Sequence, residues 1–70
     1  MSVIHQPKKI HSKSELFLAY SKIKMREKRT LINEIIAEVR GVSIKVAGYQ
    51  NNLRPKEVRL FKERIDENYF

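Results

Sequence analysis

Apolar residues near the start of the chain recur at helical spacing. Leu16, Tyr20 and Ile23 lie three or four residues apart and define one face of a helix. Ser12 precedes this stripe, and a serine followed three residues later by a glutamate is typical of a capped helix start. The pattern predicts a first helix over residues 13–26.

Two further apolar stripes predict two more helices. The first follows Thr30, which can serve as a cap, and stops before Gly41, a residue type that commonly terminates helices. The second follows Pro55, which suits the first turn of a helix. We therefore expect helices over residues 30–40 and 55–67.

Two parts of the pattern leave alternatives open. No proline or glycine separates the first two stripes, so one long helix over residues 13–40 fits as well. Residues 42–49 alternate between apolar and polar at first, as a strand does, but Ser43 can equally cap a short helix whose apolar members, Val46 and Tyr49, face inward. The prediction is a small all-α domain of three to four helices. A strand in this segment would make the fold a winged or mixed α/β type.

The length and composition set the domain organisation. The chain has 70 residues, which is room for one domain. Residues 1–11 show no helical period and are expected to form a flexible basic arm, so that residues 12–70 form the folded domain. The sequence has no cysteine, which excludes disulfides and thiolate metal sites. Together with the lack of a long apolar stretch, this predicts a cytoplasmic protein without a membrane segment.

Positive charge is concentrated in the first part of the chain. The whole sequence has 15 basic and 8 acidic residues, but residues 1–30 alone hold eight basic residues and two acids. Such an excess is typical of a surface that binds phosphates, so a nucleic acid is the expected partner. The side chains expected to contact phosphates are Lys8, Lys9, Lys22, Lys24, Lys28 and Arg29.

The sequence offers little support for catalysis. The only histidines, His5 and His11, lie in or beside the predicted arm, where a metal site would lack supporting groups. The two glycines, Gly41 and Gly48, do not form a phosphate-binding loop. We therefore expect no enzyme activity, no metal, no cofactor and no small-molecule substrate.

The most informative stretch is LINEIIAEVRGVSIKVAGYQNNLRP, residues 31–55. Ala37 lies four residues before Gly41, which is followed by Val42 and Ser43. In this arrangement, a small alanine lets two helices approach closely, the glycine supplies a positive φ, and the serine starts the next helix. The stretch resembles the helix-turn-helix of small bacterial and phage repressors.

The resemblance implies a function and a set of contacts. It implies a sequence-specific protein that binds double-stranded DNA as a small transcriptional regulator or accessory factor, and that does so as a homodimer. The side chains that would contact base edges are Ser43, Lys45, Gln50, Asn51 and Asn52. An alternative is a small helical adaptor or inhibitor that binds a regulatory protein, in the manner of an anti-repressor.

Overall fold

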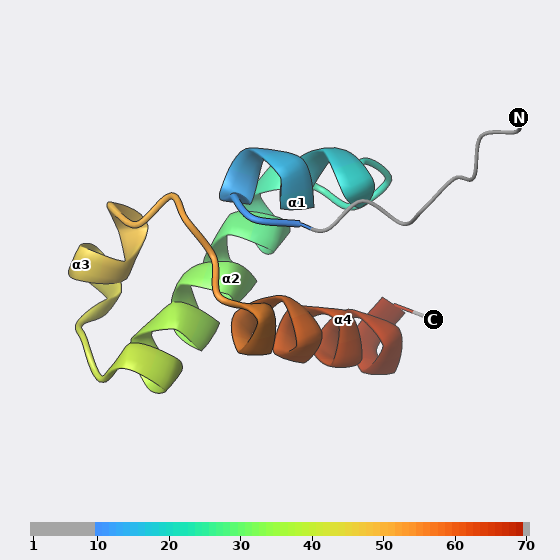
Figure 1. The fold of residues 1–70 in the computed structure, drawn as a ribbon. Coiled ribbons are helices and arrows are strands. Elements are labelled where there is room, and N and C mark those ends of the chain that lie inside the picture. The colour runs from blue at the N-terminus through green and yellow to red at the C-terminus, as the bar shows by residue number, and fades with distance from the viewer. Residues whose placement is uncertain (1–9, 70) are drawn as a thin grey trace, which may run out of the picture.

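Four helices follow one another in the computed structural model, which describes residues 10–69 (Figure 1). They are α1 (Lys13–Ala19), α2 (Met25–Arg40), α3 (Ile44–Gly48) and α4 (Pro55–Tyr69). The expected all-α class is confirmed. The mixed α/β alternative is wrong, because the segment after α2 forms a short helix and no named strand occurs in the described part of the chain.

The predicted start of α1 is confirmed, but its predicted end is not. The Ser12 hydroxyl accepts a hydrogen bond from the Glu15 amide at 3.3 Å, as a helix cap does. The Glu15 carboxylate in turn accepts from the His11 amide at 2.7 Å. The helix then stops at Ala19 rather than at residue 26.

Helices α1 and α2 are separated by residues 20–24, so the single long helix is excluded. Tertiary packing accounts for this position. Tyr20 turns inward and packs edge-on against the Phe61 ring, with 5.1 Å between the ring centroids, and Ile23 is buried. The Ile23 amide donates to the Tyr20 carbonyl in a tight turn. The chain therefore leaves the helix where Tyr20 packs on Phe61 and Ile23 is buried, although no local helix breaker is present.

Helix α2 begins five residues earlier than expected, at Met25, and Thr30 lies inside it rather than at its start. The end of α2 agrees with the prediction. Gly41 has φ 68°, in the left-handed region, and its amide donates to the Ala37 carbonyl. A side chain at this position would be strained, because only glycine adopts this conformation without steric cost.

Helix α3 is a single turn. It begins at the predicted residue, but the side chains that it buries differ from the predicted ones. The Ser43 hydroxyl accepts from the Val46 amide at 3.2 Å and caps the helix. Ala47 is fully buried, whereas Val46 and Tyr49 are 41% and 72% exposed. The predicted inward orientation of Val46 and Tyr49 is therefore wrong. The buried residue of this single turn is the small Ala47.

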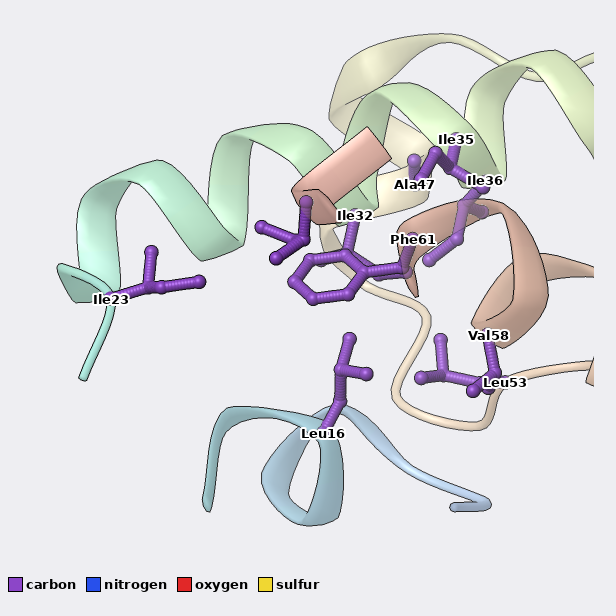
Figure 2. Packing of buried hydrophobic residues seen from close by; sticks show 10 residues of the cluster. Leu16, Ile23, Ile32, Ile35, Ile36, Ala47, Leu53, Val58 and Phe61 are labelled. Atoms are coloured by element: carbon purple, nitrogen blue, oxygen red, sulfur yellow. The ribbon is translucent and has the colours of Figure 1, made fainter. Parts of the chain in front are cut away.

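The apolar core is built around α2, which contacts each of the other three helices. Figure 2 shows the Phe61 ring of α4 between Leu16 of α1 and Ile32 of α2. The buried apolar residues are Leu16, Ile23, Ile32, Ile35, Ile36, Ala47, Leu53, Val58, Phe61 and Ile65. Because α1, α2 and α4 all contribute large side chains, this core fixes the platform from which α3 projects (Figure 1).

The connector between α3 and α4 runs antiparallel to the segment that enters α1. The Lys13 amide donates to the Asn51 carbonyl at 2.9 Å, and the Leu53 amide donates to the His11 carbonyl at 2.8 Å. These bonds form an isolated bridge between Ser12 and Asn52. The backbone around Asn51 and Asn52 thereby holds the connector against the segment that enters α1.

Candidate nucleic-acid interface

A lysine from α1 holds the C-terminal end of α3. Lys13 is buried, and its Nζ atom donates to the Asn33 Oδ1 atom at 2.7 Å, to the Ala47 carbonyl at 2.9 Å and to the Gly48 carbonyl at 3.3 Å. The three donors of the ammonium group thus meet three acceptors. Burial lowers the pKa of Lys13, and the positive charges of Arg29 and Arg40 lower it further.

An arginine at the end of α2 holds the connector that follows α3. The Arg40 guanidinium donates to both carboxylate oxygens of Glu57, at 2.8 and 3.0 Å, in a bidentate pair. It also donates to the Asn52 carbonyl at 2.8 Å and to the Gln50 Oε1 atom at 3.1 Å. One side chain therefore links α2, the connector and the start of α4.

Glu57 is the buried partner in this network. Its side chain is fully buried, and its carboxylate also accepts from the Arg54 amide at 2.8 Å. Burial by itself raises the pKa of Glu57, but the hydrogen bonds from Arg40 and Arg54 and their positive charges outweigh it, so the pKa lies below its usual value. The same hydrogen bond to Glu57 raises the pKa of Arg40. Glu57 is thus ionised in the interior and neutralised by Arg40.

The residues predicted to contact base edges lie together at the α3 end of the molecule. Lys45, Asn51 and Asn52 are exposed. Gln50 is half-buried and its side-chain oxygen is bound to Arg40, while the Ser43 hydroxyl is used in capping α3. Lys45, Asn51 and Asn52 therefore have polar groups directed to solvent, without a side-chain hydrogen bond among the described residues.

The residues predicted to contact phosphates do not form one cluster with the residues predicted to contact base edges. Lys22 and Lys24 lie in the loop before α2, at the opposite end of that helix from α3 (Figure 1). Since α2 has 16 residues, the two ends are about 24 Å apart, at ~1.5 Å per residue. Arg29 is exposed one turn into α2, whereas Lys8 and Lys9 lie outside the described residues.

Lys28 does not fit the predicted role. It is 3% exposed, and its Nζ atom donates to the Phe17 carbonyl at 2.8 Å. The same atom lies 5.7 Å from the centre of the Phe17 ring, within range of a cation–π contact. Lys28 therefore joins α1 to α2 inside the domain and is not available to a phosphate.

A second basic region, not anticipated from the sequence, flanks α3 along the chain. Residues 39–56 contain four basic residues and no acid. Arg40 is engaged with Glu57, but Lys45, Arg54 and Lys56 are exposed. The signal in the sequence is an acid-free stretch of 18 residues, which the larger excess of basic residues over residues 1–30 obscures. The α3 end thus carries positive charge without opposing acids from its own segment.

Neither a metal site nor a membrane span is found in the described part of the chain. No group of three or more histidine or acidic side chains in residues 10–69 is placed to hold a metal ion. Among these residues, no helix combines the length and apolar character that crossing a bilayer requires.

Replacing Lys13 by methionine should destabilise the domain. Methionine keeps most of the aliphatic chain but leaves the Gly48 carbonyl and the Asn33 amide oxygen without their donor, which costs about 1–3 kcal/mol of unfolding free energy. The Ala47 carbonyl retains the Gln50 amide as a donor. Urea unfolding followed by circular dichroism measures the loss.

Lys22→Met is the matched control, because it removes an exposed lysine and should change the unfolding free energy by less than about 0.5 kcal/mol. Equal stability of the two variants would show that Lys13 does not anchor α3.

Comparison of the chain with protein-family models, curated proteins and solved structures found no match.

Proposed function

We propose that this protein binds double-stranded DNA through α2, the turn and α3, as a small transcriptional regulator or accessory factor. In this proposal α2 and α3 form a helix-turn-helix, and α3 enters the major groove. The observation that carries the proposal is that a glycine turn with a capped helix after it lies within an acid-free, basic segment, residues 39–56. DNA carries one negative charge per ~1.7 Å of its axis, so such a surface is attracted to it.

The local geometry supports this proposal. The Ala37 carbonyl accepts the amides of both Gly41 and Val42, which closes the end of α2. Ser43 then caps α3 at once. Short connections of this kind bring two helices into contact at a fixed angle, as a helix-turn-helix requires.

The N-terminal arm adds to the proposed interface. The His11 carbonyl is bonded to the Leu53 amide, so the arm joins the domain beside the connector that follows α3. We propose that Lys8 and Lys9, which lie outside the described residues, add phosphate contacts. Because one module of this size covers little DNA, we propose that a homodimer binds two half-sites about one helical turn apart.

Titration of the protein against a random-sequence duplex at several salt concentrations tests the proposal. The binding constant should fall with a log–log slope of about −0.9 per phosphate neutralised. The double variant Arg54→Ala/Lys56→Ala should reduce the magnitude of this slope by about 1–2, because these exposed residues lie next to α3 in the sequence.

Lys22→Ala/Lys24→Ala is the matched control, since it removes the same charge at the other end of α2. If only this second variant reduces the slope, the contact surface lies at the α1–α2 loop instead. A wild-type affinity that is weak and independent of salt would contradict DNA binding altogether.

The adaptor function remains the second candidate because α3 exposes apolar side chains. Ile44, Val46 and Tyr49 are the exposed apolar residues of this region, and protein partners often cover such residues. An adaptor needs no steep salt dependence toward DNA. The same titration therefore separates the two functions.

A further inference from the structure

We infer that α3 recognises DNA by apolar contact with the methyl groups of thymine, through Ile44 and Val46. This inference rests on the proposed DNA binding and specifies which chemical groups the surface reads. It differs from the hydrogen-bonded readout by polar side chains that the sequence suggested.

Two large apolar side chains of α3 are exposed. Ile44 is 52% exposed, and Val46 is exposed as well. Only Ala47 is covered by the rest of the domain. An Ile and a Val on the same exposed turn leave apolar surface in water, which is unfavourable unless a partner covers it.

Two of the polar side chains next to this surface, Ser43 and Gln50, have limited capacity left for base edges. The Ser43 hydroxyl accepts from the Val46 amide, and the Gln50 side-chain oxygen accepts from Arg40. A bidentate contact between glutamine and adenine needs that oxygen together with the amide nitrogen. To make this contact with adenine, the Gln50 side chain would have to give up its hydrogen bond with Arg40.

Gly48 gives a second, independent observation. It is the last residue of α3, where glycine is less favourable than alanine because it leaves the unfolded chain more freedom. Its φ is not positive, and a Cβ atom added there would meet only the Asn33 Nδ2 atom, at an ordinary contact distance of 3.9 Å. The fold therefore does not require a glycine. A glycine on an exposed turn permits the close approach of another molecule to the backbone.

Charge complementarity identifies DNA as the molecule that covers this surface. Lys45 projects from the same turn, and Arg54 and Lys56 are exposed after the connector, with no acid between residues 39 and 56. In DNA, apolar groups accessible between two rows of phosphates are the thymine methyl groups of the major groove. RNA lacks this methyl group, and its major groove is too narrow for a helix. The surface therefore suits thymine-containing duplex DNA.

The test uses duplexes recovered by selection from a random 20-base-pair pool. Each recovered duplex is remade with deoxyuridine in place of thymidine, which removes the methyl group and keeps the charge. We expect the dissociation constant to rise about fourfold per contacted methyl group, the equivalent of ~0.8 kcal/mol for one buried carbon. In the double variant Ile44→Ala/Val46→Ala, thymidine and deoxyuridine duplexes should bind equally.

Leu18→Ala is the control, because it removes an exposed apolar side chain from α1 and should keep the preference for thymidine. Equal affinity of the wild type for both duplexes would overturn the inference and leave the proposed DNA binding intact. Failure to recover any duplex above background would overturn both. A thymidine preference that survives in the double variant would place the methyl contacts elsewhere and overturn the role of Ile44 and Val46.

Gly48→Ala adds a test that separates folding from binding. The substitution should raise the ratio of folded to unfolded protein roughly two- to fivefold, because alanine is the better helix residue. The added methyl group should nevertheless weaken binding to the selected thymidine duplex, if the DNA approaches the backbone there. A variant that is more stable and binds at least as well as the wild type would refute the close approach at Gly48.

Discussion

The variant Arg40→Met should be less stable than the wild type by about 3–5 kcal/mol, the usual cost of removing one partner from a buried ion pair. Methionine leaves the Glu57 carboxylate fully buried with the Arg54 amide as its remaining donor. The connector also loses the bonds from Arg40 to Asn52 and Gln50. Net stabilities of folded domains are only about 5–15 kcal/mol, so much of this protein's stability should be lost. Chemical unfolding at neutral pH gives the value.

The pH dependence of this variant should have the opposite sign to that of the wild type. In the wild type, Glu57 has a pKa below its reference value of 4.5, so its contribution to stability is complete above pH 4.5 and is lost as the pH falls through the folded-state pKa. Without Arg40, burial dominates and raises the pKa of Glu57. Acidification should then protonate Glu57 and recover part of the lost stability.

Two further variants make the Arg40 prediction specific. Arg59→Met removes an exposed arginine from α4 and should change the unfolding free energy by less than about 0.5 kcal/mol. Arg40→Met/Glu57→Leu removes both charges and should recover most of the loss, because well-packed apolar residues can replace a buried pair at little cost. If the single substitution Arg40→Met left the protein as stable as the wild type, Glu57 would have to have an alternative partner.

The second large effect is expected for Phe61→Ala, at about 3–5 kcal/mol of unfolding free energy. Phe61 is fully buried, lies between Leu16 and Ile32 (Figure 2), and has Tyr20 edge-on to its ring. Alanine would leave a cavity where three helices meet. Because Tyr20 also ends α1 by packing here, the helix content should fall together with stability. Thermal unfolding followed by circular dichroism records both.

Leu18→Ala provides the comparison for Phe61, since Leu18 is 77% exposed and its loss opens no cavity. We expect its unfolding midpoint to remain within the scatter of the wild type. Similar destabilisation by both substitutions would contradict the arrangement of the core described above.

Helix ends were predictable from the sequence wherever a local interaction sets them. The cap at Ser12, the left-handed Gly41, the cap at Ser43 and the start at Pro55 are all found in the structure. Each depends on groups within about four residues, so a short window of sequence contains the cause.

Long-range packing set the features that the sequence did not reveal. The break at residues 20–24 follows from contacts with α4, and no glycine or proline marks it. The burial of Lys28 depends on α1, and the pairing of Arg40 with Glu57 joins residues 17 positions apart. The orientation of α3 was mispredicted because a single turn has too few residues for periodicity to show which face is covered. At the candidate interface, Lys45, Asn51 and Asn52 are exposed, as contact with DNA would require, whereas the bond between Gln50 and Arg40 depends on the fold.

The anchoring of α3 by Lys13 also has a consequence for how the chain folds. The bond from Lys13 to the Ala47 carbonyl spans 34 residues, and the loop it closes must lose conformational entropy before the bond can form. Helix α2 can nucleate from local contacts, whereas α3 acquires its anchor only when α1 has met α3. The segment over residues 31–55 is therefore not a portable module: transplanted onto another scaffold, it would carry the turn but lack the lysine that orients its last helix.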